Sequence, residues 1–546
     1  MWRAQPIVTA SSDTAGRWRA AAEEDEGVST TTVHPTPLVP RRTAASIGVL
    51  AVAAALAAGH LVAGLVSPAS SPFLAVGNGA IALAPQWLVE FAKSTFGVAD
   101  KPVLLGGMAL VLLAAAVGVG LASRERPQPG TRALTGLGLL GFAAVALSPA
   151  FTPVDLLAPA AAAGVGIVVL RRLHALALPG APRTGSGMDR RTMLTGTSAL
   201  VGFGALAAGG LGQLLGGRLT GSREEVTARL RGLALAERAP AVPAGAAFPE
   251  LGTPTFLTAN ADFYRIDTAL RIPTQTAADW SLRIHGMVDR ELVLTFDDLL
   301  ARPLLERTVT MICVSNEVGD DYISTTNFIG VDLREILLEA GIAPGADQVL
   351  STSSDGLWTA GTPVDVLLEP DRGALLAVGM NGEALPPEHG FPVRMVVPGL
   401  YGYVSATKWV TDLEVTTFDR EQAYWLQRGW GRFGPVKTQS RIDVPRAAGS
   451  TPAGRVTVAG IAWSQPIGIS RVEVRLDDGP WTTAELATEV GGDTWRMWRA
   501  EVDAAAGSHV VTVRATDANG VTQTEERAPV IPDGATGYHS VVFSAV

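Results

Sequence analysis

The chain has 546 residues, of which 47% are hydrophobic and 17% are charged, and its formal net charge at pH 7 is −9. A mean hydropathy of +0.25 is too high for an ordinary soluble protein of this length. The acidic balance, without a basic block interleaved with aromatic residues, argues against nucleic acid as a partner. Nearly all the apolar excess lies before residue 220, so the sequence predicts a membrane domain followed by soluble domains.

Residues 1–40 are rich in Ser, Thr, Ala and Pro and have no apolar period, so we expect a disordered cytoplasmic tail. Residues 41–220 are expected to form an α-helical membrane domain with about five transmembrane helices, because crossing the hydrocarbon takes about 20 apolar residues. The intervening stretch 72–100 is interrupted by polar residues, and we expect an external or interfacial loop there. The apolar segments are 45–67, 102–122, 132–148 (short for a crossing), 154–170 and 193–216.

The arginines of the short connections predict the orientation, since cytoplasmic loops retain Lys and Arg. Arginines precede the first segment and lie between the second and third and between the fourth and fifth segments. The connections 68–101 and 149–153 contain two Lys and no Arg. This distribution predicts five crossings from a cytoplasmic N-terminus, with everything after residue 220 outside the cytoplasm.

Arg190 and Arg191 are followed, after one residue, by an apolar pair, so the segment 188–216 is similar to a twin-arginine translocation signal. The alternative is that the two arginines only anchor the cytoplasmic end of the fifth helix. Two membrane histidines, His60 and His174, could ligate a haem only if they met. The predicted topology puts them at opposite membrane faces, so we do not expect haem within this chain.

Three further regions follow the membrane domain. Residues 221–254 predict a charged juxtamembrane helix and a linker rich in Pro, Ala and Gly. Over 255–445, strands such as 308–313 alternate with short helices such as 332–340, which is typical of an α+β domain. Over 446–546, short strands alternate with Asp-Gly, Asn-Gly and Pro turns at the spacing of an immunoglobulin-like β-sandwich.

Cys313 is the only cysteine of the chain, so it cannot form an intramolecular disulfide or a multi-cysteine metal site. Its remaining roles are buried core residue, nucleophile and single metal ligand. The apolar strand 308–313 opens after this residue into the polar run 315–321. A side chain at the end of a strand, beside a loop, is well placed for a functional site.

Several dispersed motifs occur in the soluble half. They are FYRIDTALRIP (263–273), LRIHGMVDRELVLTFDDL after Trp280 (282–299), CVSNEVG (313–319), GVDLREILLEAGI (330–342), SSDG (353–356), MNGEALPPEHGFPVRMVVPG (380–399) and KWVTDLEV (408–415). In this order the region 256–546 resembles the sulfite oxidase family of molybdenum enzymes. The resemblance implies a sulfite-oxidase-like molybdopterin domain followed by a β-sandwich of the dimerisation type.

The resemblance also implies a molybdenum–molybdopterin cofactor without a nucleotide extension. Cys313 would be the protein thiolate on the metal, since a soft thiolate suits such a centre. By motif position, Arg394 and Lys408 would bind the pterin phosphate, which needs fixed cationic donors. Asn316, Asp355 and His389 would be hydrogen-bond partners of the pterin. The catalytic set would be Cys313, Arg265, Tyr322 and Tyr403.

Departures from the family pattern restrict the substrate. Arg265 matches the family's first arginine, but Glu317, Asp320 and Asp321 stand after Cys313 where the sulfite-oxidising members have a cation. Since sulfite is a small dianion, this charge pattern favours a neutral substrate such as an S-oxide or N-oxide.

A second arginine of the family is missing before Lys408, where the chain has tyrosines instead. Tyr322, Tyr401 and Tyr403 could line a pocket for a neutral, partly apolar substrate, or they could serve only in packing.

The sequence therefore predicts a membrane-anchored, multi-pass oxidoreductase that transfers an oxygen atom in a two-electron reaction outside the cytoplasm. Sulfite oxidation is one alternative, and a non-catalytic binding module on the same fold is another. The chain has no Cys-x-x-Cys-His motif, so electrons are expected to come from a quinone, flavin or haem protein in or outside the membrane. The β-sandwich could form a homodimer.

Overall fold

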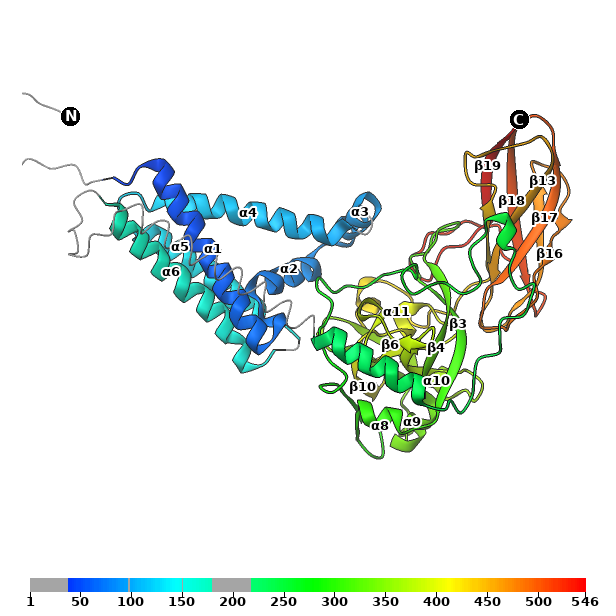
Figure 1. Cartoon of the computed structure of the whole chain (residues 1–546), viewed down its shortest axis with the longest axis horizontal. Helices are drawn as coiled ribbons and strands as arrows, with labels where there is room; N and C mark the ends of the chain where they lie inside the picture. Colours follow the sequence, from blue (N-terminus) through cyan, green and yellow to red (C-terminus); the bar gives the residue numbers. More distant parts are fainter. Residues whose placement is uncertain (1–37, 97–98, 150, 179–217) are drawn as a thin grey trace, which may run out of the picture.

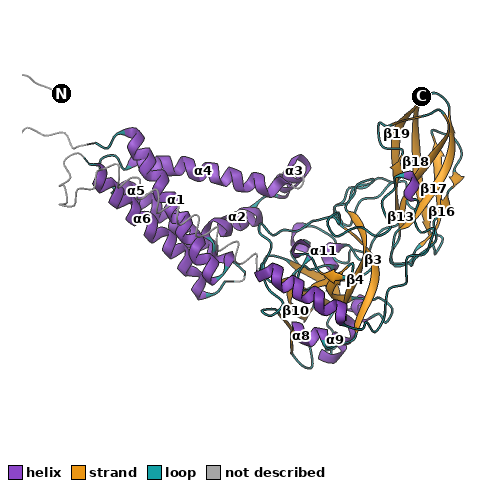
Figure 2. Cartoon of the chain, in the orientation of Figure 1, coloured by secondary structure: helices purple, strands orange, loops and turns teal. Residues whose placement is uncertain are grey.

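The computed structural model describes residues 38–96, 99–149, 151–178 and 218–546. Figure 1 shows three bodies in chain order: a helical bundle in blue and cyan, a mixed domain in green and yellow, and a C-terminal body in orange and red. Figure 2 shows that the first body consists of helices and the last mainly of strands. The bundle helices are α1 (Arg41–Val66), α2 (Pro72–Leu83), α3 (Gln86–Phe96), α4 (Asp100–Ala122), α5 (Gln128–Ala146) and α6 (Leu157–Ala177), with 3-10 turns η1 (Pro68–Ser70) and η3 (Pro153–Leu156).

Three helices of the described residues are long and apolar enough to cross a membrane: Arg41–Val66, Asp100–Ala122 and Pro153–Ala177. The predicted count of five is not confirmed. Helix α5 has 19 residues, but its first turns contain Gln, Thr and Arg side chains and it is not one of the three. The segment 193–216, predicted as the fifth crossing, and the twin arginines lie outside the described residues.

The stretch 72–100, expected to be an external or interfacial loop, is mainly helical, because it forms α2, α3 and the start of α4. Pro72 begins α2 at a position where a helix needs no backbone N–H, and Pro85 separates α2 from α3. At 12 and 11 residues, these two helices are too short to cross a bilayer. Helix α3 exposes Trp87 and Phe91, at 67% and 55% of their surface.

The second body is an α+β domain with two sheets around one core. One sheet has the order β2-β1-β10-β5-β6, with β1 and β10 parallel. Its strands are β1 (Ser281–Gly286), β2 (Leu292–Thr295), β5 (Gln348–Ser353), β6 (Thr359–Pro363) and β10 (Val410–Thr416).

The other sheet has the order β3-β4-β7-β8, with β9 paired to β7. Its strands are β3 (Leu304–Ile312), β4 (Ile323–Asp332), β7 (Leu375–Met380), β8 (Glu383–Ala384) and β9 (Arg394–Val396). Short helices join the strands: α8 (Phe296–Leu300), α9 (Leu333–Ala340), α10 (Val364–Leu368), α11 (Gly402–Ser405), η4 (Pro249–Leu251), η5 (Pro387–His389) and η6 (Leu426–Arg428).

Residues 218–254 pack against both soluble bodies. Residues 218–232 are helical, and Val226 and Leu230 belong to the core of the α+β domain. The following stretch, which we predicted to be a linker, buries Phe248 in the same core. It also accepts a hydrogen bond at Gly245 O from the backbone N–H of Thr488 in the C-terminal body (2.9 Å). This segment therefore ties the two soluble domains together.

The C-terminal body consists of two sheets facing each other across a core that contains Trp498 and Phe543. One sheet has the order β11-β13-β17-β16 and the other β12-β19-β18-β14-β15. Strand β11 lies before the predicted domain start at 446 and pairs with β13. The immunoglobulin type stays a prediction. The strands are β11 (Gln439–Val444), β12 (Ser450–Thr451), β13 (Gly454–Trp463), β14 (Ile469–Leu476), β15 (Thr482–Thr483), β16 (Glu485–Leu486), β17 (Arg496–Ala504), β18 (Gly507–Asp517) and β19 (His539–Ala545).

Helices α1 and α4 approach each other closely through small residues. This contact leaves no room for a larger side chain at Gly120, which can be tested. A Cβ atom at Gly120 would overlap the carbonyl group of Ala44, whereas a Cβ at Gly118, half a turn away, would meet nothing within 4 Å. Gly120→Val is expected to destabilise the bundle by about 1–3 kcal/mol, the usual cost of overpacking. Thermal melting of the detergent-solubilised protein measures this, with Gly118→Val as the matched control. Equal melting temperatures for the two variants would contradict the α1–α4 contact.

Candidate active site

Cys313 lies at the turn between β3 and β4, directly after the last ladder pair, Ile312 with Ile323. Its backbone N–H donates to Tyr322 O (3.0 Å), and its carbonyl accepts from the N–H of Asn316 (3.0 Å). The backbone N–H of Ser315 lies 3.4 Å from the sulfur. This N–H favours the thiolate form, which metal binding requires. The loop thus presents a half-buried sulfur from two fixed strands.

Asn316 closes the same loop. Its side-chain oxygen accepts the backbone N–H of Tyr322 at 2.8 Å, and the residue is buried. The structure therefore gives Asn316 a role in shaping the loop around Cys313, while its contact with a pterin stays a prediction.

The acidic part of this loop packs against the C-terminal β-sandwich. Arg441 donates to the carbonyl of Asp320 (2.8 Å), and Gly319, at φ 93°, lies where a Cβ atom would overlap the imidazole of His539. Burial raises the pKa of Glu317 and of Asp320, and neighbouring carboxylates add to both shifts. The carboxylates interpreted from sequence as substrate determinants therefore have a second explanation, since they belong to a domain contact.

Arg394 is a buried cation at the start of β9, with 3% of its surface exposed. Its guanidinium donates only to carbonyl groups, including His389 O (3.1 Å) and Ala406 O (3.5 Å). The described residues place no carboxylate within ion-pair distance of it. Burial lowers its pKa to about 10, so the group still carries its charge at neutral pH. A buried charge without a counter-charge is costly, which points to a bound anion.

Lys408, just before β10, is a second cation of this pocket. Its ammonium donates to Glu388 O (2.9 Å) and lies 3.4 Å from a carboxylate oxygen of Asp267. Burial lowers its pKa to about 8, although Asp267 opposes the shift. Among the described ion pairs, Arg394 and Lys408 together have one carboxylate partner, Asp267.

His389 ends η5 and is 2% exposed. Its Nε2 donates to Asn260 O (3.2 Å), so the neutral ring has an acceptor at Nδ1, which is buried and has no hydrogen-bond partner among the described residues. Burial and the nearby charges of Lys408 and Arg394 lower its pKa to about 3, which keeps the ring neutral. An N–H donor of a bound group would satisfy this buried acceptor.

Asp355 follows β5. It accepts hydrogen bonds from the hydroxyl of Ser353 (2.5 Å) and the N–H of Leu357 (3.1 Å). Burial raises its pKa, and the charge of Asp267 contributes to the shift. The N–H of its neighbour Ser354 donates to Trp409 O (2.8 Å), so Asp355 lies beside the segment that carries Lys408.

Arg265 does not project freely toward a substrate, because its Nε lies 2.9 Å from Asp267. The Asp267 side chain is 4% exposed. Burial would raise its pKa, but Lys408, Lys101 and Arg265 outweigh burial and hold the pKa well below its usual range. The sequence analysis did not identify Asp267 or Lys101 as site residues. Asp267 lies inside the motif 263–273, in which only Arg265 was considered.

Tyr264 is a further residue that sequence reasoning missed. Burial raises its pKa, the charge of Cys313 adds to the shift, and Arg394 opposes it. Its hydroxyl therefore lies within electrostatic reach of both the thiol and the guanidinium. The signal was its place in the motif at 263–273, directly before Arg265.

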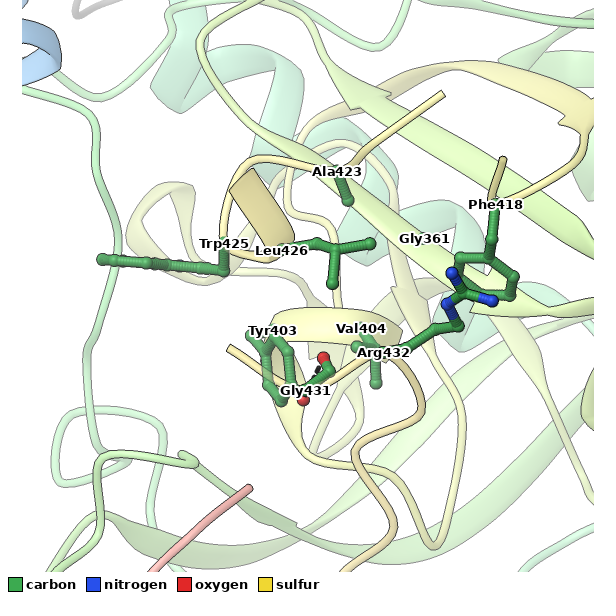
Figure 3. Close-up of a pocket in the computed structure, with 9 residues that line it drawn as sticks. All are labelled: Gly361, Tyr403, Val404, Phe418, Ala423, Trp425, Leu426, Gly431 and Arg432. Carbon is green, nitrogen blue, oxygen red and sulfur yellow. Dashed lines mark hydrogen bonds between the residues drawn. The ribbon is translucent and has the colours of Figure 1, made fainter. Parts of the chain in front are cut away.

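The three tyrosines predicted to line a substrate pocket, Tyr322, Tyr401 and Tyr403, lie in different surroundings. Burial raises the pKa of Tyr322 and raises that of Tyr401 to about 12, and the charge of Cys313 contributes to both. Tyr403 instead donates its hydroxyl to Gly431 O (2.7 Å). Figure 3 shows Tyr403 in a small pocket lined by residues that include Phe418, Trp425 and Arg432. None of the cofactor-binding residues predicted above lines this pocket.

This set of residues fits a molybdopterin group. Two buried cations suit a phosphate, an unpartnered buried acceptor suits a pterin N–H, and a thiolate suits the metal. Among the described residues no three His, Cys, Asp or Glu side chains gather as metal ligands. A metal bound by Cys313 would therefore need further ligands from a non-protein group such as a dithiolene.

Comparisons with known proteins agree with this fit. A family model, the oxidoreductase molybdopterin binding domain, matches residues 269–425. The sulfite oxidase of Gallus gallus is 30% identical over 328 residues, covering 52% of this chain and 71% of that protein. The mitochondrial sulfite oxidase of Homo sapiens is 29% identical over 334 residues, and the chain spans 60% of its length.

An NADH nitrate reductase of Oryza sativa subsp. japonica is 28% identical over 317 residues, covering 47% of this chain and 34% of that protein. The crystal structure of the sulfane dehydrogenase SoxCD from Paracoccus pantotrophus matches with a TM-score of 0.47 and 23% identity, over 56% of this chain and 88% of that one. The sequence relatives and the matched family model show that the chain belongs to the sulfite oxidase family of molybdopterin-dependent oxidoreductases and is an enzyme of that family.

Proposed function

We propose that this enzyme is anchored in the membrane by several helices and transfers an oxygen atom to or from an S-oxide or N-oxide outside the cytoplasm. The three apolar helices support the anchoring. The side of the membrane is supported by the contact of Lys101 with Asp267 (2.5 Å), because Lys101 lies in the first turn of α4, at the end of a connection predicted to be extracytoplasmic. The twin-arginine-like segment 188–216 would deliver the folded domain to that side.

The pairing of the cations at the site is the observation that favours a neutral substrate. Each of the four cations in the cluster around Asp267 and Arg394 already has a partner or a cofactor role. Arg265 and Lys101 contact Asp267, Lys408 contacts Asp267 and Glu388 O, and Arg394 faces carbonyl groups. A dianion such as sulfite would need cations that are not committed elsewhere, whereas a neutral oxide needs only a hydrogen-bond donor.

The residues of the chain then have distinct roles. The bound molybdenum cofactor supplies two-electron oxygen-atom transfer. Cys313 holds the metal, and Arg394 and Lys408 hold the phosphate, with no nucleotide extension on the pterin. His389, kept neutral by burial, accepts a pterin N–H through Nδ1. Tyr264, whose raised pKa keeps its hydroxyl protonated, can donate to the oxygen of a neutral oxide.

Sulfite oxidation is the second candidate, and two observations favour it. The Arg265 side chain is 44% exposed, so its ion pair with Asp267 can open at small cost. The carboxylates after Cys313 pack toward the β-sandwich, which weakens the argument that they repel a dianion. Membership of an enzyme family and the retained thiol remove the support for a purely non-catalytic module.

Electrons would be exchanged with a quinone, flavin or haem protein in the membrane or outside the cytoplasm. The reason is that the chain contains no haem-attachment motif and a molybdenum centre needs a redox partner. A homodimer through the β-sandwich remains part of the proposal.

A substrate screen on the molybdenum-loaded protein tests the proposed reaction. Methionine sulfoxide or trimethylamine N-oxide is expected to reoxidise the dithionite-reduced centre, followed by stopped-flow absorbance, while sulfite should reduce the oxidised centre slowly or not at all. Cys313→Ser is the control, and it should contain no molybdenum and give no signal. Rapid reduction by sulfite, with no reoxidation by either oxide, would establish the second candidate instead.

Arg394→Met is expected to separate cofactor binding from folding. The substitution removes the cation for the phosphate, so molybdenum per chain, measured by mass spectrometry, should fall to near zero. It also removes a buried charge without a carboxylate, so the melting temperature of the cofactor-free protein should be unchanged or higher. Arg231→Met, at an exposed position of the 218–232 helix, is the matched control and should bind molybdenum normally. Normal loading of Arg394→Met would contradict the phosphate role.

A further inference from the structure

The helical bundle touches the α+β domain at the motif segment 263–273. Lys101, in the first turn of α4, donates to the carboxylate of Asp267 (2.5 Å) and to its backbone carbonyl (2.9 Å). Nearby, α2 approaches through Gly77, where a Cβ atom would lie 2.9 Å from the side chain of Leu270. Two separate bundle helices therefore contact one short segment of the catalytic domain.

Asp267 links this contact to the cofactor pocket. One carboxylate oxygen lies beside Lys101, and the other lies beside Arg265 (2.9 Å) and Lys408 (3.4 Å). The Asp267 side chain is 4% exposed and that of Lys408 is 11% exposed, so solvent screens their interaction little. The strength of the interaction between Asp267 and Lys408 therefore depends on whether Lys101 holds the other carboxylate oxygen in place.

We propose that Lys101 is a positioning residue for the cofactor pocket, and that docking of the helical bundle through Lys101 and Asp267 leaves Lys408 available for the anionic phosphate. The proposal rests on the molybdopterin role proposed above for Lys408. Without Lys101, the carboxylate of Asp267 is released to turn toward Lys408 and compete with the phosphate for it. The bundle then contributes to the site that it anchors.

The charge around Asp267 supports this role. Three cations surround one carboxylate, so the group as a whole keeps a positive surplus toward the pocket. Replacing Lys101 by a neutral residue removes one positive charge from this group. Of the three cations, Lys101 is the one that comes from the helical bundle. Groups that contact a metal ligand typically change metal affinity by about 10–100-fold when lost, and Lys101, which lies further from the bound group, is expected at the low end of that range.

Retention of molybdenum tests the proposal. Lys101→Met is expected to lose bound molybdenum about tenfold faster than the wild type during dialysis. Lys101→Arg, which keeps the cation, should retain most of it. Gly77→Leu should reproduce part of the loss with Lys101 intact, because the added side chain pushes α2 away from Leu270. Arg231→Met, an exposed cation on the catalytic domain, is the control and should behave as the wild type.

Amide hydrogen exchange provides a readout that does not need the cofactor. Residues 264–271 are expected to exchange faster in Lys101→Met than in the wild type, in loaded and cofactor-free protein alike, while the β-sandwich strands stay protected. Unchanged exchange and unchanged molybdenum retention in folded Lys101→Met would overturn the proposal, as would equal loss in Arg231→Met. A wild type that never binds molybdenum would instead refute the proposed function, and the exchange experiment would still decide whether Lys101 docks the bundle.

Discussion

The burial of positive charge beside too few carboxylates is the constraint on which the candidate active site depends. Arg394 and Lys408 lie inside the domain, where an uncompensated charge costs of the order of several kcal/mol. Among the described ion pairs, Asp267 is the only carboxylate that either of them contacts. A bound phosphate would restore the charge balance, and an N–H of the pterin would satisfy the empty acceptor of His389. The cofactor therefore completes the charge and hydrogen-bond pattern of this fold.

The β-sandwich also shapes the site, because it holds the loop that carries Cys313. Arg441 donates to the carbonyl of Asp320, and the imidazole of His539 leaves room only for a glycine at position 319. On the other side, the backbone N–H of Trp495 donates to the hydroxyl of Thr310 in β3 (2.7 Å). Since β3 leads directly to the thiol, a shift of the sandwich would move the sulfur. Loop position therefore depends on contacts far away in sequence.

Motifs in the sequence predicted the residues that strand ends bring together. Cys313, just after β3, was found from the residues themselves, whereas Arg394, which begins β9, and Lys408, just before β10, were found through the family resemblance of their motifs. Lys101 and Asp267 are 166 residues apart and meet only because two bodies dock, which no periodicity signals. The helices within 72–100 were missed for a different, local reason, since prolines that interrupt one long apolar helix can instead begin short ones. The acidic residues after Cys313 could be identified from the sequence. Their packing toward the β-sandwich could not, because it depends on contacts with residues far away in sequence.

The substrate class then depends on two neighbouring residues of one segment. Arg265 is partly exposed, and an exposed ion pair is worth about 0–1 kcal/mol, so releasing its guanidinium from Asp267 toward an anion costs little. That release supplies one positive charge, whereas a dianion leaving water requires more than one. In the proposed reaction Tyr264 would supply a neutral donor at no such cost, because a phenol is protonated at neutral pH and burial raises its pKa further. On the proposed function, a neutral oxide would need only the donors already in the pocket, and sulfite would need Arg265 together with a second cation drawn from the group around Asp267.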